Sequence, residues 1–313
     1  MTGLIDVHHH ILPPDYVTAL GGRIGKQGLT GAVPTWDPEL SVAAMDRNGI
    51  ARAITSISSP GIWFGDRGET KELARYCNEY AADMAKTHPG RFGCFAVLPL
   101  PNVEDSLAEI DYAFDTLGAK GVGLLTNYDG RYPGDPEFAP VFEELDRRNA
   151  AIFYHPTLSK GWDSLPDIPV PTLEFPFDTT RAVVNMLHEG VFRRYYKIRF
   201  IFVHAGGAIP FLAERINRLA VLPKFRENVP NGVRPILKRL YFDVALSANS
   251  LSMSTTTQVV DTGNLFFGSD FPHAGEATMT ETVEGLTDLD RLFGAKADTL
   301  LTANARDAFA FDA

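Results

Sequence analysis

The sequence has few of the features that define several common classes of protein. Its 313 residues include two cysteines, Cys77 and Cys94, which cannot form a disulfide framework or a thiolate metal site. No apolar run approaches the ~20 residues that span a membrane. The first residues lack the basic segment and apolar stretch of a secretory signal. We therefore expect a cytoplasmic protein that does not bind membranes.

Basic charge is scarce as well. The chain has 29 Lys and Arg residues against 39 Asp and Glu residues, and its formal net charge is −10. Nucleic acids and anionic membranes select basic faces, so neither is expected as a partner. The composition, 45% hydrophobic and 22% charged, is that of a globular protein. We expect residues 1–313 to form a single domain.

Short apolar runs rich in β-branched residues recur along the chain, and most are followed by a helical pattern. The predicted strands are 4–9, 51–58, 91–100, 121–126, 151–155, 199–205, 240–245 and 265–270. The predicted helices are 37–49, 69–90, 102–118, 136–149, 178–195 and 208–220. Near-continuous apolar strands are typical of a parallel sheet that is buried on both faces.

Eight strands alternating with helices predict an α/β fold, the (β/α)8 or TIM barrel. The alternative is an open doubly wound sheet, which would usually carry a glycine-rich phosphate loop after its first strand. Here "HHHILPP" occupies that place, which favours the barrel. Two long connections, the glycine-rich 21–36 and the segment 156–178 with five prolines, are expected to be lids or interfaces.

The ends of the predicted strands carry half of the chain's eight histidines. His8 and His10 end the first strand, His155 the fifth and His204 the sixth, and Asp270 ends the eighth. Side chains alternate across a strand, so His8 and His10 point the same way, about 7 Å apart along the chain. A single histidine at a strand end is usually a scaffold residue. This group, all at the carboxyl ends of barrel strands, predicts a site for Zn²⁺, Mn²⁺ or Fe²⁺.

Asp6 lies two residues before His8 and is expected on the same side of the strand, deeper in the barrel. It either accepts a hydrogen bond from a ligand imidazole or closes the barrel floor. His9 points the other way and is expected to pack or to support the ligands.

Four short motifs, "DVHHH", "YHP", "VHAGG" and "GSDFPH", together resemble the amidohydrolase superfamily. Within it the chain is most similar to the metal-dependent decarboxylases of aminocarboxymuconate semialdehyde, γ-resorcylate and 6-methylsalicylate. The similarity runs the whole chain and is most specific over 175–216. It implies a metal ion bound by four side chains and a proton-handling histidine beside it. The implied ligands are His8, His10, His155 and Asp270, and the proton-handling residue is His204.

Two departures from the superfamily refine this expectation. Dinuclear members use a modified lysine at the end of strand four, where this chain reads "GLLTNYDG". One metal ion per chain is therefore expected, Zn²⁺ first and Mn²⁺ second. Aminocarboxymuconate-semialdehyde decarboxylases carry arginines in the first capped helix that hold a substrate carboxylate. Here "PELSVAAMD" offers Ser41 and Ala43, which favours a simpler aromatic acid over a dicarboxylate.

The walls of the pocket are predicted from position alone. Aromatic side chains on the loops could sandwich a planar ring, although packing of a lid explains each of them equally well. Arg181 could meet a carboxylate or only solvent. The predicted substrate-binding residues are Trp63, Phe64, Asn127, Tyr128, Phe177 and Arg181, and Phe175 is grouped with them.

The resemblance, together with the strand-end histidines, implies a mononuclear metal-dependent decarboxylase, a carboxy-lyase, of a small hydroxyaromatic or related unsaturated carboxylic acid. The metal would act as Lewis acid and template, and Asp270 or His204 would protonate the carbon that loses CO₂. The alternative is a mononuclear hydrolase of an amide or lactone. A non-catalytic metal protein is a weaker third interpretation.

A homodimer is also expected, from the resemblance and from apolar side chains in the proline-rich insertion. These side chains are more numerous than a solvated loop needs. They are Leu165, Ile168, Val170, Leu173 and Phe175.

Overall fold

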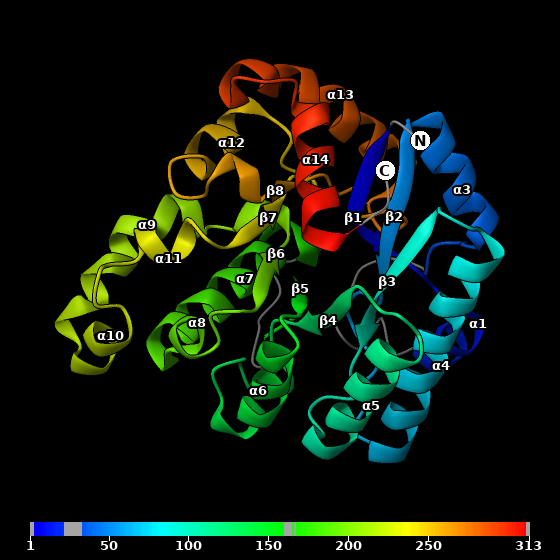
Figure 1. Ribbon diagram of the computed structural model, residues 1–313, viewed down its shortest axis with the longest axis horizontal. Coiled ribbons are helices and arrows are strands. Elements are labelled where there is room, and N and C mark those ends of the chain that lie inside the picture. The colour runs from blue at the N-terminus through cyan, green and yellow to red at the C-terminus, as the bar shows by residue number, and fades with distance from the viewer. Residues whose placement is uncertain (1–2, 22–32, 160–164, 166, 311–313) are drawn as a thin grey trace.

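The computed structural model describes residues 3–21, 33–159, 165 and 167–310. Eight parallel strands follow one another around a single sheet in chain order, and the helices surround them (Figure 1). The strands are β1 Leu4–His10, β2 Ile50–Ser56, β3 Phe92–Val97, β4 Gly121–Leu125, β5 Ala151–His155, β6 Arg199–Phe202, β7 Tyr241–Asp243 and β8 Leu265–Phe266.

The sheet closes on itself through the residues that follow β8. The amide of Val7 donates to the carbonyl of Phe267 at 3.0 Å, and the amide of Asp270 donates to the carbonyl of His8 at 2.8 Å. The prediction of a (β/α)8 barrel is confirmed, and the open doubly wound sheet is wrong. Closure also brings Asp270, which lies far from β1 in sequence, next to His8.

The helices lie between successive strands and after the last one. They are α1 Pro14–Leu20, α3 Pro38–Arg47, α4 Arg67–Thr87, α5 Val103–Asp115, α6 Ala139–Arg147, α7 Val170–Glu189, α8 Val191–Arg194, α9 Ile209–Asn217, α10 Pro223–Asn228, α11 Arg234–Leu237, α12 Ser250–Thr256, α13 Gly275–Phe293 and α14 Ala297–Phe309. Short 3-10 turns are η1 Pro136–Phe138, η2 His204–Gly206, η3 Arg218–Val221 and η4 Thr262–Asn264. No helix in the described ranges is long and apolar enough to cross a membrane.

The inside of the barrel is filled by apolar side chains from β1, β2, β3, β5, β6 and β8, and α14 closes one end. Phe309 packs against Phe95 and Phe266 of the barrel interior, with ring centroids 5.5 and 5.6 Å apart. Figure 1 shows α14 beside β1, near both ends of the chain. Because the strands begin at this end, the side chains available for a site are those at the opposite, carboxyl ends.

Helix α7 differs from the prediction, because it starts at Val170 rather than at residue 178. Pro171 sits in the first turn, where a helix does not need its missing N–H. Pro176 lies inside the helix, where it removes one backbone hydrogen bond. The helix ends at Gly190, which adopts φ +73° and stops it with a left-handed residue.

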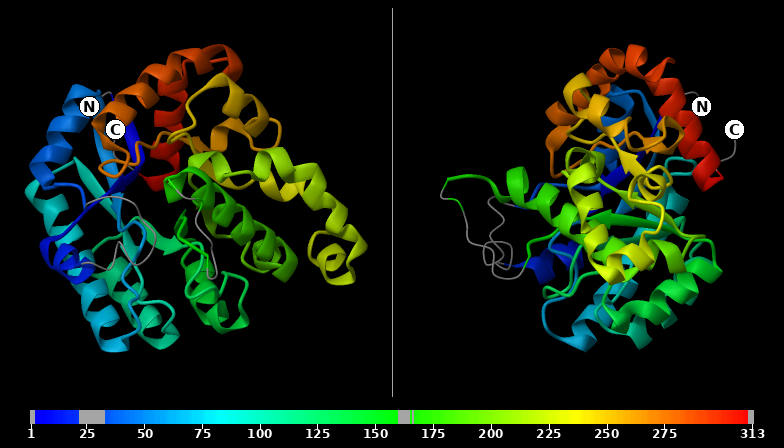
Figure 2. Two further views of the ribbon diagram at one scale, coloured as in Figure 1. Left: turned by 180° about the vertical axis from the view of Figure 1, so that it is seen from behind. Right: turned by 90° about the vertical axis from the view of Figure 1, so that its left-hand side faces the viewer.

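Residues 170–178 of the expected proline-rich loop are therefore helical. Residues 160–164 and 166 of that connection lie outside the described residues, as do 22–32 of the glycine-rich connection. The right-hand view of Figure 2 shows the first turns of α7 and helix α1 on the same side of the barrel.

Candidate active site

Four buried side chains from three strand ends converge at the carboxyl end of the barrel. Their candidate ligand atoms all lie within 4.8 Å of one another; the residues are His8, His10, His155 and Asp270. The Nε2 atoms of His8 and His10 are 3.0 Å apart. They lie 3.2 and 3.0 Å from Oδ1 of Asp270, and Nε2 of His155 lies 4.0 Å from the same oxygen. The predicted set is thus assembled in space.

The second nitrogen of each imidazole is held by a neighbouring group. Nδ1 of His8 donates to Asp243 Oδ2 at 2.8 Å, and Nδ1 of His155 donates to the carbonyl of Pro156 at 2.8 Å. A carboxylate and a carbonyl can only accept, so the proton of each neutral ring is on Nδ1 and the Nε2 lone pair faces the centre. Nδ1 of His10 lies 3.0 Å from Ser56 Oγ.

The charge balance of this cluster suits a cation. Burial lowers the pKa of His8, but the carboxylates of Asp243 and Asp270 outweigh it and raise the pKa to about 10. Burial lowers the pKa of His10 to about 3 and also lowers that of His155. The three imidazoles therefore accommodate one positive charge and resist a second. A divalent ion on the Nε2 lone pairs would supply that charge and release the proton, so these residues fit a metal.

Asp270 stays ionised in this setting. Burial works against the charged form, yet the charge of His8 and the hydrogen bond from His10 hold the pKa of Asp270 well below its usual range. The carboxylate is therefore available as a metal ligand. Its backbone adopts φ +59°, a left-handed conformation that costs about 1–3 kcal/mol for a residue other than glycine and is common at functional sites.

His204 stands beside the cluster with a free ring nitrogen. Its Nε2 lies 3.5 Å from Asp270 Oδ2 and has no hydrogen-bond partner among the described residues, although it is buried. Its backbone has φ +54°, and its amide donates to Asp243 Oδ1 at 2.9 Å. A buried imidazole nitrogen without a hydrogen-bond partner, 3.5 Å from a candidate ligand carboxylate, is suited to contact a bound molecule.

The turn after β6 is compact because two glycines let other elements approach. A Cβ atom on Gly206 would lie 2.4 Å from the Phe242 ring, and one on Gly207 would lie 2.3 Å from the carbonyl oxygen of Pro176. Both glycines have positive φ. The "HAGG" motif therefore places His204 on a turn that packs directly against β7 and α7.

A cavity of about 880 Å³ opens onto the cluster, within the range of small-molecule sites. His155, His204 and Asp270 line it, together with His273, whose ring centroid lies 5.4 Å from that of His10. Among the described residues that line it, none is a lysine or an arginine. Its apolar wall consists of Val33, Pro34, Pro169, Pro171, Phe175, Pro176, Leu246 and Ala274.

The predicted substrate-binding residues lie elsewhere. Trp63, Asn127 and Tyr128 line a separate hollow of about 230 Å³. Nε1 of Trp63 donates to Asp129 at 2.8 Å, and Tyr128 is buried, with its hydroxyl accepting from the amide of Leu125.

The other three also lie outside the large cavity. Phe64 packs half-buried against the core, and Phe177 is 44% exposed. Arg181 lies 3.8 Å from Asp178 and 3.9 Å from Glu174. Phe175 lines the cavity whereas Phe177 does not, because two residues along a helix turn a side chain by about 200°.

Some side chains at the site were not singled out from the sequence. Asp243, Ser56 and His273 each contact a predicted ligand. A lone acid inside the apolar run "LYFDVA" was the available signal for Asp243.

Asp6 accepts from the backbone amide of His8 and from Nδ1 of His9, both at 3.0 Å. The pairing of β1 with β2 shifts register between Asp6 and His9, so Asp6 supports His9 instead of a ligand ring.

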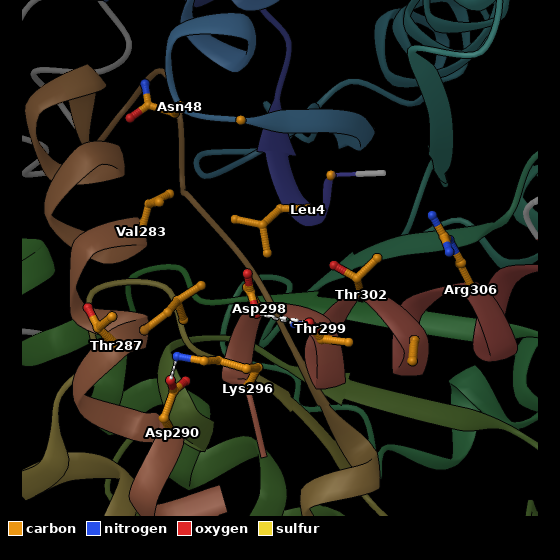
Figure 3. A pocket seen from close by; sticks show the side chains of 14 residues that line it. Leu4, Asn48, Val283, Thr287, Asp290, Lys296, Asp298, Thr299, Thr302 and Arg306 are labelled. Carbon is orange, nitrogen blue, oxygen red and sulfur yellow. Dashed lines mark hydrogen bonds and ion pairs between the residues drawn. The ribbon is translucent and has the colours of Figure 1, made fainter. Parts of the chain in front are cut away.

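A second hollow of about 590 Å³ lies at the other end of the barrel, between the start of β1 and helices α13 and α14 (Figure 3). Figure 3 shows Lys296 turned toward Asp290, with which it pairs. Lys296 and Asp290 form an ion pair near solvent here, and none of the four candidate ligands is among the described residues that line this hollow.

The sequence pattern of the amidohydrolase family matches residues 5–311, so the chain belongs to that family. Decarboxylase yanB of Aspergillus niger is 35% identical, over 97% of this chain and 85% of that protein. The 6-methylsalicylic acid decarboxylase of Penicillium expansum is 34% identical, over 86% of this chain and 85% of that protein.

Solved structures share the fold over the whole chain. An amidohydrolase II is 31% identical, with a TM-score of 0.89 over 98% of this chain and 100% of that one. The 5-carboxyvanillate decarboxylase of Novosphingobium aromaticivorans, complexed with manganese and 4-hydroxy-3-methoxy-5-nitrobenzoic acid, is 21% identical. Its TM-score is 0.85, over 99% of this chain and 97% of that one.

Proposed function

We propose that this protein is a metal-dependent, non-oxidative decarboxylase of a small hydroxyaromatic or related unsaturated carboxylic acid. The observation that carries the proposal is the Nε2 and carboxylate cluster at the base of a cavity that has no lysine or arginine among its described lining residues. A substrate carboxylate that enters this cavity would have a cation held by these residues as its main positive partner. The relatives at 34–35% identity are named decarboxylases, which favours this reaction over hydrolysis of an amide or lactone.

The proposed ligands are His8, His10, His155 and Asp270, and the proposed ion is Zn²⁺, with Mn²⁺ second. Three imidazoles and one carboxylate are a donor set that zinc accepts readily, whereas the carboxyvanillate decarboxylase that shares the fold holds manganese. When bound, the ion would supply Lewis-acid charge and orient the carboxylate and its neighbouring oxygen. One ion per chain is expected.

The protein's own residues would orient the ring and move a proton. Phe175 and the proline-rich wall line the cavity and would exclude water from one side of the ring. Loss of CO₂ breaks a carbon–carbon bond, and its electron pair must take up a proton at the ring carbon. His204 Nε2 and Asp270 Oδ2, 3.5 Å apart, are the proposed source, because a proton can pass between them and toward the ring.

An isotope experiment tests the reaction. The metal-loaded protein is offered salicylates, resorcylates and muconate semialdehydes in D₂O, and CO₂ release is measured. A decarboxylase must place one deuterium on the carbon that lost CO₂. Oxygen from labelled water in a carboxylate product, without ring deuterium, would establish the hydrolase instead.

We also propose a homodimer that covers apolar side chains of the insertion and of α7. Leu165, Ile168 and Phe177 are 54, 43 and 44% exposed, and Leu173 is 37% exposed, whereas Phe175 is buried. Apolar side chains grouped in this way are typical of an interface. Sedimentation at micromolar concentration should show a species of twice the 34.4 kDa chain mass. A species of one chain mass would count against the dimer.

A further inference from the structure

Asp178 follows Phe175 and Pro176 in the motif "FPFDTT", and nothing in the proposed reaction uses it. Its carboxylate is fully buried on α7. It accepts hydrogen bonds from Asn127 Nδ2 at 2.8 Å and from the hydroxyl of Tyr132 at 2.6 Å. It also accepts one from the Thr126 hydroxyl. A buried carboxylate costs free energy unless its oxygens accept hydrogen bonds, so these three donors are needed to keep Asp178 buried.

The donors come from the end of β4 and the loop that follows it. Two of them also bind the segment after β5. The Thr126 hydroxyl accepts from the amide of Thr157 at 3.1 Å, and Asn127 Nδ2 also lies 3.2 Å from the carbonyl of Leu158. Burial and Asp178 both raise the pKa of Tyr132, which keeps its hydroxyl a donor. Asp178 thereby ties α7 to the ends of two barrel strands.

The part of α7 just before Asp178 forms the cavity wall. The ring of Phe175 packs edge-on against His155, with centroids 5.8 Å apart, and Pro176 contacts Gly207 of the turn that carries His204. Pro176 removes one of the backbone hydrogen bonds that would stiffen this part of the helix. The first turns of α7 therefore depend on side-chain contacts for their position.

We propose that Asp178 is a positioning residue, which seats the first half of α7 on β4 and β5 so that Phe175 forms the cavity wall beside His155. It does not touch the reacting atoms; it acts through Phe175. The geometric part of this inference stands by itself, whereas its effect on turnover rests on the proposed function.

The test variant is Asp178→Asn, which keeps the size of the side chain but cannot accept from all three donors. Hydrogen exchange of peptides that cover 170–178 should become about tenfold faster, because this part of α7 separates from the ends of β4 and β5 more often. With full metal content, KM for the decarboxylated acid should rise about tenfold while kcat changes less than about threefold. Asp129→Asn is the control, since this carboxylate accepts from Trp63 outside the cavity, and it should leave both measurements unchanged.

A double-mutant cycle tests whether Asp178 acts through Phe175. Phe175→Ala should raise KM by a similar factor, and the double variant should be no worse than about twofold beyond the stronger single variant. If the effects of the two single variants on KM multiplied in the double variant, the proposal would be overturned. Unchanged exchange or unchanged KM in Asp178→Asn would also overturn it. If that variant does not fold, Tyr132→Phe removes one donor and should give a smaller rise in exchange and KM, about threefold.

The two proposals fail separately. A wild-type protein that releases no CO₂ from any tested acid refutes the decarboxylase. Because exchange is measured without substrate, faster exchange over 170–178 in the Asp178→Asn variant would still support the positioning role of Asp178.

Discussion

The two ends of the barrel each have a hollow, and they differ in what their polar side chains face. At the amino end, Lys296 pairs with Asp290 and is 72% exposed, so these charges satisfy each other and contact water (Figure 3). At the carboxyl end, buried groups converge on one point and His204 Nε2 has no hydrogen-bond partner in the described part of the chain. The volumes, about 590 and 880 Å³, both fall within the range of small-molecule sites, so size does not show which hollow is the site. Unsatisfied, convergent and buried polar atoms therefore identify a site better than size does.

The largest expected effect comes from removing two ligands together. His8→Ala with His10→Ala should abolish metal retention and turnover, because two of four donor groups are lost. The fold should survive, since the barrel is held by the apolar interior and by backbone ladders. Elemental analysis should fall from about one metal equivalent to none, with far-ultraviolet circular dichroism unchanged. Two equivalents in the wild type would contradict the mononuclear assignment.

The next effect separates proton transfer from metal binding. His204→Asn should keep the metal and lower kcat by ~10²–10⁴, the usual contribution of general acid–base catalysis. Metal content and turnover are measured on the same sample. Loss of the metal in this variant would make His204 a ligand and leave Asp270 as the group that delivers the proton.

A smaller effect is expected from the carboxylate behind the cluster. Asp243→Asn should weaken metal affinity about 10–100-fold, because it alters the hydrogen bond that orients His8 and lowers ligand basicity. Competition with a chelator of known affinity measures this change. The same variant also perturbs the contact to the His204 amide, so kcat measured at saturating metal should fall as well. Unchanged metal affinity would show that His8 does not depend on Asp243.

The smallest effect is expected at the amino end and sharpens the contrast between the two hollows. Lys296→Ala breaks an exposed ion pair, and such pairs contribute little to stability. Turnover and metal content should equal those of the wild type, and Tm should move by no more than about 2 °C. A tenfold loss of turnover here would mean that the two ends of the barrel are coupled.

Several features of the molecule can be predicted from short stretches of chain. Short apolar runs predict eight strands, and the barrel confirms their order. A residue at the end of such a run lies at the mouth of the barrel whatever the surrounding loops do, so residue type and position are enough to group His8, His10, His155 and Asp270. The absence of a lysine at the end of the fourth strand can also be read from the sequence, because residue type alone shows it.

Loop side chains cannot be predicted in this way. Trp63 and Asn127 follow their strands as predicted, yet their hydrogen bonds to Asp129 and Asp178 turn them into a separate hollow. The predicted start of α7 is eight residues late, because prolines ordinarily end a helix, while Pro171 and Pro176 are accommodated within this one. Both outcomes depend on partners that are distant in sequence.

Periodicity and the residue type at one end of each strand were enough to predict the barrel and the strand-end histidines, and the resemblance of four short motifs implied the family. The folded chain was needed to show which nitrogen of each ring faces the centre, since Asp243 and Pro156 hold Nδ1 of His8 and His155 from outside the ligand set. It was also needed to show that Phe175, rather than Phe177, lines the cavity. The physical reason is that hydrogen bonds and packing between distant segments set side-chain direction, whereas local pattern sets only position along an element.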